Sequence, residues 1–93
     1  MSNKDKLLSA LECAEAYCSE VELGYDSGSG IGFLVIMKPE IMIQGYSVQL
    51  FDVIRGVDCQ FSIDLSDRDV EYDDVEDEFV VSAHGGIYTF QFR

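Results

Sequence analysis

The feature that most constrains the fold is a strict alternation of apolar and polar residues between positions 57 and 65. Side chains of a β-strand point to opposite faces in turn, so this spacing predicts a strand with one face in a core and the other in water. Residues 46–54 predict a preceding strand, joined near Arg55-Gly56, with apolar residues on both faces that indicate either a bulge or burial of both faces. The alternating apolar residues are Val57, Cys59, Phe61, Ile63 and Leu65.

Two further strand pairs are predicted on either side. Residues 21–25 alternate before the loop 26–30, and after Gly32 the chain continues as F-L-V-I-M, a strand that ends at Pro39. A phosphate-binding glycine loop would open a helix, whereas this loop precedes a strand, so a hairpin connection is favoured. Segments 79–83 and 87–92 flank Gly85-Gly86, a hairpin signal because glycine accepts a positive φ.

The amino-terminal residues predict an amphipathic helix. Ser2 and Asp5 approximate a capping box, and apolar residues follow at helical spacing over about 16 residues. Together these patterns predict an α+β fold in a single domain, 1–93, with the helix packed on an antiparallel sheet of about five or six strands. A small closed barrel with the helix as a lid is the alternative. The apolar stripe comprises Leu7, Leu11, Ala14, Cys18 and Val21, widened by Ala10 and Tyr17.

The segment Asp67–Glu78 holds eight carboxylates among twelve residues, opposed only by Arg68. Its first carboxylates recur at every second position from 67 to 73, which predicts a row on one face of a strand, about 6.6 Å apart. That spacing is comparable to successive phosphates of an extended nucleic-acid strand. A mobile, solvated loop is the alternative, although Val70, Tyr72 and Val75 favour a strand at a sheet edge. The predicted partner-binding residues are Asp64, Asp67, Asp69, Glu71, Tyr72, Asp73, Asp74, Glu76, Asp77 and Glu78.

The sequence favours neither a metal site nor a catalytic site. Carboxylates of this segment fall at positions 1, 3, 5, 7 and 12 of a calcium-loop register, but Tyr72 occupies position 6, where glycine is needed, and strands flank it. His84 is a lone histidine beside a turn, with no nucleophile at interpretable spacing. Three cysteines without a C-x-x-C pair predict buried structural thiols in a reducing, cytoplasmic protein: Cys13, Cys18 and Cys59. We therefore expect no cofactor, no metal and no enzymatic activity.

The charge of the chain limits its partners. A hydrophobic content of 47% predicts a folded protein, so the net charge of -12 lies on a folded surface. Such a surface repels nucleic acids and anionic membranes and attracts basic proteins. No segment approaches the roughly 20 apolar residues of a membrane span. We expect a basic, nucleic-acid-binding protein as the partner, with no direct binding of nucleic acid or membrane.

These expectations combine into a function. The sequence predicts a small acidic binding or inhibitor protein that mimics nucleic acid and blocks the basic groove of a nuclease, restriction or CRISPR effector. In size and charge the chain is similar to phage-encoded inhibitors, including anti-CRISPR and anti-restriction proteins, and to bacterial immunity proteins. That resemblance includes no shared motif and implies no family. The alternative is a generic interaction or oligomerisation module whose acidity serves solubility, and a homodimer is possible.

Overall fold

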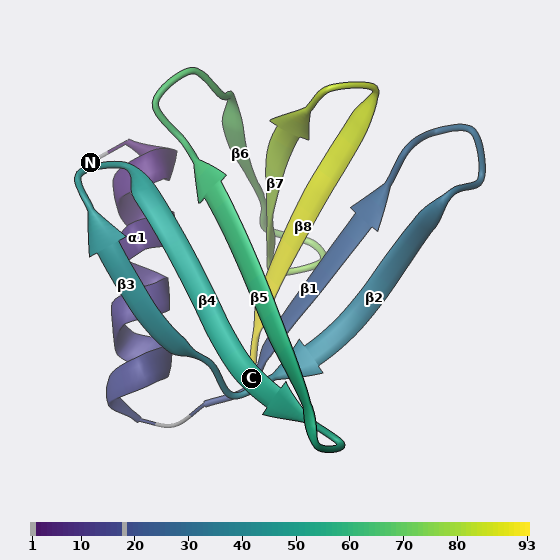
Figure 1. Ribbon diagram of the computed structural model, residues 1–93. Helices are drawn as coiled ribbons and strands as arrows, with labels where there is room; N and C mark the ends of the chain where they lie inside the picture. The colour runs from purple at the N-terminus through teal and green to yellow at the C-terminus, as the bar shows by residue number, and fades with distance from the viewer. Residues whose placement is uncertain (1, 18) are drawn as a thin grey trace.

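A computed structural model describes residues 2–17 and 19–93 and contains, within them, one helix and eight strands in two antiparallel sheets (Figure 1). The larger sheet has the strand order β2-β1-β8-β7-β6, and the smaller sheet has the order β3-β4-β5. The elements are α1 (Asn3–Ala16), β1 (Val21–Asp26), β2 (Gly32–Met37), β3 (Glu40–Gln44), β4 (Ser47–Ile54), β5 (Val57–Asp64), β6 (Val70–Asp73), β7 (Glu78–Ala83) and β8 (Gly86–Phe92).

The two sheets face each other, and their strands diverge toward the top of Figure 1. Most neighbouring strands are consecutive hairpins, but β1 pairs with β8 and so joins the first strand to the last. The turn between β4 and β5 is Arg55-Gly56, where φ values of 53° and 78° match the mirror-image turns that tight hairpins prefer. The turn between β7 and β8 is His84-Gly85, one residue earlier than the sequence predicted, because Gly86 already pairs with Ala83.

The core lies between the inner faces of the sheets. Phe90 of β8 is completely buried, and Phe61 of β5 lies across from it with ring centroids 6.2 Å apart. Phe61 also contacts Tyr88 edge-to-face at 5.2 Å, so aromatic contacts connect the smaller sheet to the larger one. The alternation predicted for residues 57–65 explains this placement, since it directs Phe61 and Ile63 inward. The aromatic side chains Tyr88, Phe90 and Phe92 of β8 therefore pack in or against the core.

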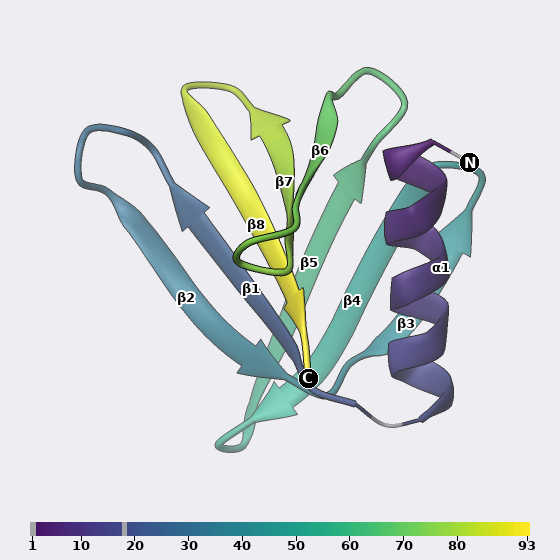
Figure 2. The same cartoon turned by 180° about the vertical axis from the view of Figure 1, so that it is seen from behind.

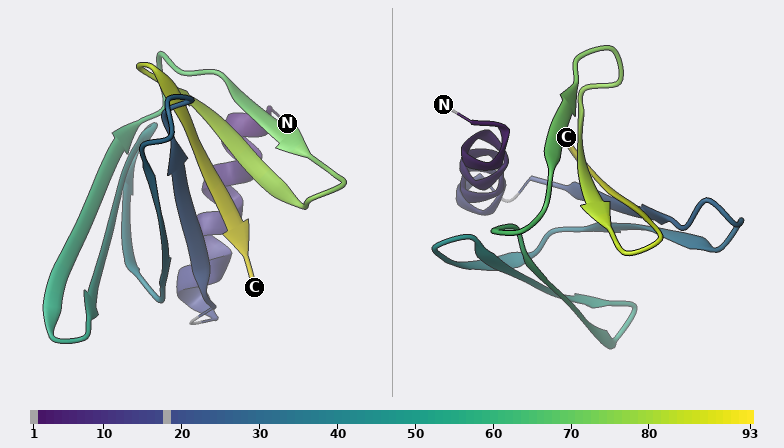
Figure 3. Two further views of the ribbon diagram at one scale, coloured as in Figure 1. Left: turned by 90° about the vertical axis from the view of Figure 1, so that its right-hand side faces the viewer. Right: turned by 90° about the horizontal axis from the view of Figure 1, so that it is seen from above.

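Helix α1 lies to one side, between the edge strands β3 and β6 (Figures 2 and 3). Ser2 caps it as predicted, with its Oγ accepting a hydrogen bond from the Asp5 amide at 3.2 Å. Asn3 Nδ2 donates to the Val70 carbonyl at 3.2 Å, which ties the helix to β6. At the other side, the Glu15 carboxylate accepts a hydrogen bond from the Ile41 amide of β3. The helix thus covers the gap between the sheets on that side.

Several predictions need correction. The α+β class is confirmed, but the strands form two sheets, and α1 packs at the side of both instead of across one. Strand β3 was not predicted. The helix ends at Ala16, so Tyr17 is 80% exposed and Val21 belongs to β1, although Leu7, Leu11 and Ala14 are buried as predicted.

The thiols also differ from the prediction. Cys13 is exposed on α1 and Cys59 is half-buried on β5, so the expectation of a buried thiol is wrong for Cys13. Cys18 lies outside the described residues. Within the described ranges, no helix has the length and apolar character needed to cross a membrane.

Candidate functional site

The acidic segment is an edge strand between two turns. Asp67 lies in the turn that follows β5, and Asp69 immediately precedes β6. Glu71, Tyr72 and Asp73 lie within β6, which pairs only with β7 and forms one edge of the larger sheet. The edge-strand interpretation is therefore confirmed for 70–73. The remaining predicted residues, Asp74, Glu76, Asp77 and Glu78, form the turn after β6 and begin β7.

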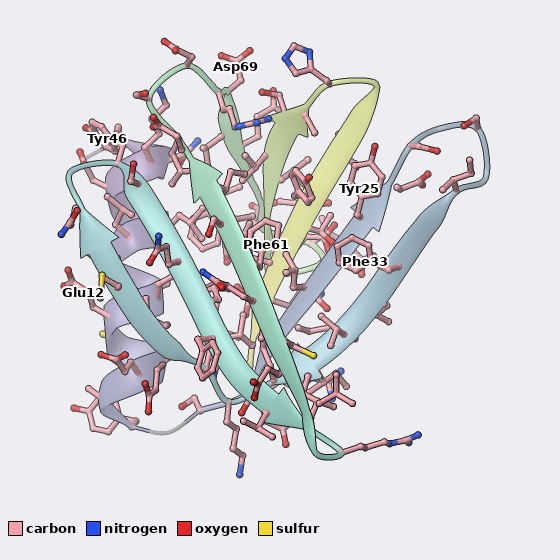
Figure 4. All side chains as sticks on the ribbon, viewed as in Figure 1. Glu12, Tyr25, Phe33, Tyr46, Phe61 and Asp69 are labelled. Atoms are coloured by element: carbon pink, nitrogen blue, oxygen red, sulfur yellow. The ribbon has the colours of Figure 1, made fainter. Side chains whose placement is uncertain are left out.

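Three carboxylates follow the predicted row. The backbone register of β6 and β7 extends to Asp69, whose carbonyl accepts from the Ser82 amide at 2.9 Å. Val70 points inward and is buried, so Asp69, Glu71 and Asp73, at the alternate positions, share the outer face of the sheet about 6.6 Å apart. Figure 4 shows Asp69 at the open end of the molecule. The row is shorter than predicted, because Asp67 lies in the turn.

A second row of carboxylates runs across the strands. Asp73 is paired with Glu78 of β7, Glu78 with Gln91 of β8, and Gln91 with Glu22 of β1. Glu22 was missed from the sequence, because only the pairing of the first strand with the last brings it to this face. Six of the exposed or half-exposed acidic residues at this edge are called the acidic ridge below: Asp69, Glu71, Asp73, Asp74, Glu76 and Glu78.

Cations do not neutralise the ridge. Arg68 is half-buried, and its guanidinium donates to two carbonyls, those of Asp64 at 3.2 Å and Ser82 at 2.8 Å. Among the described residues, the only ion pair within 4.0 Å joins Arg93 Nη2 to Glu22 Oε2 at 3.0 Å. The ridge therefore presents its negative charge to solvent, where a basic surface can approach it.

Asp64 has a local role that sets it apart from the ridge. Its Oδ1 accepts hydrogen bonds from the Ser66 amide at 2.9 Å and the Ser66 hydroxyl at 2.7 Å. These two bonds hold the pKa of the Asp64 carboxyl below its usual value, and the charges of Arg68 and Lys4 add to the effect. Asp64 therefore fixes the turn after β5.

Two other predicted residues hold the turn between β6 and β7. Asp73 Oδ1 accepts from the amides of Val75 at 3.0 Å and Glu76 at 3.3 Å, an arrangement typical of aspartate in turns. The Asp77 carboxylate accepts a hydrogen bond from the Tyr72 hydroxyl, which raises the pKa of Tyr72. Asp73 therefore belongs to the outer-face row and also stabilises the turn, whereas the Asp77 carboxylate is engaged by Tyr72.

The pKa of Glu78 is affected by the crowding of carboxylates at this edge. Partial desolvation, followed by the charges of Asp73, Glu76 and Glu22, raises the pKa of the Glu78 carboxyl above its usual 4.5. A carboxyl with a raised pKa in the folded state favours folding when protonated. Its contribution is therefore present below pH 4.5 and is lost as pH rises through the raised value.

We expect Glu78→Gln to stabilise the protein at pH 7, because it removes a charge that folding brings close to three others. The melting temperature of the variant should exceed that of the wild type at pH 7, and the difference should shrink as pH falls below 4.5. Thermal unfolding followed by circular dichroism at both pH values measures it. Glu12→Gln, on the exposed side of α1, is the control. Equal melting temperatures at pH 7 for the two variants would contradict the expected repulsion.

A polar pocket of about 330 Å³ adjoins the ridge. The turn after β7 brings His84 to its wall, as predicted for a turn residue, but the sequence did not place it beside carboxylates. Within residues 2–17 and 19–93, no three histidine, cysteine or acidic side chains are grouped to hold a metal ion. The calcium-loop register falls on a strand and turns flanked by strands. The pocket is lined by Asp64, Asp67, Arg68, Ser82, Ala83 and His84.

The arrangement as a whole is suited to binding through charge. It offers fixed carboxylates at strand spacing, and Val75 at the tip of the turn is 86% exposed, an apolar group surrounded by acidic ones. Charge of this kind accelerates and orients association, while an apolar contact slows release. No family model, curated protein or solved structure with which the chain was compared matches it.

Proposed function

We propose that the protein is a small acidic binding protein whose ridge occupies a basic groove that otherwise holds nucleic acid. The observation that carries this proposal is the row Asp69, Glu71 and Asp73, held at regular spacing on an ordered strand without a neutralising cation among the described residues. Side chains of arginine and lysine arrayed for phosphates can meet such a row one by one. Grooves of nucleases, restriction enzymes and CRISPR effectors have this character.

The turn between β6 and β7 supports a docking role. It extends beyond the strands at the end of the ridge, and the side chain of Val75 at its tip is exposed and accessible to a partner. The turn is nevertheless held in shape by Asp73 and by the Tyr72–Asp77 hydrogen bond. A rigid tip loses little conformational entropy on binding, which favours affinity.

Competition with nucleic acid tests the proposal. Purified nucleases, restriction enzymes and CRISPR effectors are titrated with the protein in the presence of labelled substrate DNA or RNA, and the released nucleic acid is measured by fluorescence anisotropy. We expect displacement by at least one of these proteins, and weaker binding as salt rises from about 0.05 M to about 0.5 M. Complexes that hold protein and nucleic acid together, or binding insensitive to salt, would reject mimicry and leave acidity as a solubility device.

A further inference from the structure

Strand β2 forms the edge of the larger sheet opposite the acidic ridge, and it has unusual chemistry for an edge. It pairs with β1 on one side only, and residues 31–37 contain no charge. Four large apolar side chains there are 44–72% exposed. Natural proteins usually protect such an edge with charge, proline or a cover, because its unpaired amides and carbonyls attract another strand. The four are Ile31, Phe33, Leu34 and Ile36.

The other sheet edges are protected in the usual ways. Strand β6 carries the ridge, and β3 is covered by α1, where Glu15 accepts from the Ile41 amide. The outer face of β5 has only polar side chains at alternate positions, Asp58, Gln60 and Ser62. Each of these three edge strands carries one exposed large apolar side chain, namely Met42, Val57 and Tyr72. A run of several such side chains therefore distinguishes β2 among the described edge strands and is suited to pairing with another strand.

We propose that β2 pairs antiparallel with β2 of a second copy about a twofold axis at Val35, which joins the two larger sheets into one. A strand that pairs with its own copy makes a closed, self-complementary contact and ends association at the dimer. The outer faces of the two larger sheets form one continuous face only if outer-face residues of one β2 lie opposite outer-face residues of the other. In this register Leu34 lies opposite Ile36 of the second copy, and Val35 lies opposite its own counterpart.

Charge repulsion between two copies is weaker at this edge than over the rest of their surfaces. With a net charge of -12, two copies repel over most of their surfaces. Four strand spacings, about 19 Å, separate β2 from β6, which is more than twice the Debye length of about 8 Å at physiological salt. Contact through β2 therefore keeps the two ridges apart and exposed at the outer edges of the joined sheet.

The ends of β2 add complementary charge. Exposed Lys38 follows the strand, and Asp26 of β1 is paired with Gly32, which has no side chain. With the axis at Val35, Lys38 of each copy comes opposite Gly32 of the other and can reach over it toward Asp26. An axis at Leu34 also keeps the faces together, but it places Lys38 opposite Gly30, away from this carboxylate.

The contact is small, so the dimer should be weak. One strand edge and a few apolar side chains bury less than the roughly 800 Å² per partner of a standard interface. We expect a dissociation constant of about 10–100 µM. Sedimentation velocity from about 5 to 500 µM covers this range.

Leu34→Lys is the decisive variant, because the side chain is 67% exposed in the monomer and the change places a charge at the shared edge. We expect the dissociation constant to rise at least about tenfold. Met42→Lys, at a side chain that is 57% exposed on the smaller sheet, should leave dimerisation unchanged. Circular dichroism checks the fold, and Leu34→Ser replaces Leu34→Lys if that variant unfolds. A wild type that stays monomeric at 500 µM, or a dimer insensitive to Leu34, overturns the proposal.

A charge swap tests the register. Lys38→Glu and Asp26→Lys should each weaken the dimer, because each creates two like-charged pairs across the axis, whereas the double variant should recover most of the loss. The Lys38 amide keeps its hydrogen bond to Asp52 Oδ2 at 3.0 Å in all three variants, whereas Asp26→Lys removes the acceptor of the Gly28 amide, so circular dichroism checks the fold of the two variants that carry it. Losses that simply add in the double variant contradict an axis at Val35.

Discussion

Neutralising Asp69, Glu71 and Asp73 together, as Asn, Gln and Asn, should weaken binding to a basic groove about 100-fold. Each residue can form one close contact with a cation of the partner, and such contacts contribute about 1 kcal/mol each when partly desolvated. Asn at position 73 keeps an oxygen that accepts from the amides of Val75 and Glu76, so the turn should survive. Surface plasmon resonance against the target identified by competition measures both rate constants.

The control removes the same number of charges elsewhere. The control residues are Glu12, Glu40 and Asp58, which are exposed and lie on α1, β3 and β5. Changing them to Gln, Gln and Asn removes three negative charges, as the ridge triplet does. Glu15 is unsuitable, because it accepts from the Ile41 amide. The control should slow association modestly, by less than about tenfold, and leave dissociation unchanged. Equal losses from both triplets would mean that only total charge matters.

Local patterns predicted the elements of the fold that depend on neighbouring residues. The alternation at 57–65 identified β5, and the turn at Arg55-Gly56 joined it to β4, because a tight hairpin fixes its own register. Helix α1 followed from its cap and stripe. The predicted apolar stripe extended beyond the end of the helix. Val21 lies seven residues after Ala14, which matches helical spacing although Val21 belongs to a separate strand.

The division into two sheets could not be predicted, because it depends on the pairing of β1 with β8 across most of the chain. No short-range pattern encodes that contact. Strand β3 has only five residues after Pro39, so its alternation of Ile41 and Ile43 was too brief to distinguish from a loop.

The candidate site was predictable in composition but not in detail. The run of carboxylates at every second position located the edge strand, and Val70 indicated which positions face inward. The sequence could not show which carboxylates also fix turns, since Asp64, Asp73 and Asp77 differ from their neighbours only in the amides and hydroxyls that folding brings to them.

Replacing Phe90 with Ala should destabilise the protein by about 3–5 kcal/mol, a large fraction of the 5–15 kcal/mol typical of a domain. Phe90 is completely buried, lies between Leu23 and Phe79 in the sheet, and faces Phe61 of the other sheet. Its removal leaves a cavity where the two sheets meet. In urea the unfolding midpoint should fall by more than about 1 M.

Ile87 provides the matched control on the same strand, because its side chain is 40% exposed on the outer face. Ile87→Ala should cost less than about 1 kcal/mol of stability.

The comparison of the two variants also tests whether the angle between the sheets is fixed. They diverge from the end where they meet, and only α1 closes the side between β3 and β6, so the opposite side has no covering element among the described residues. If Phe90→Ala costs little more than Ile87→Ala, the smaller sheet must swing inward to fill the cavity, which would make the angle between the sheets adjustable instead of fixed by the aromatic contacts of Phe61.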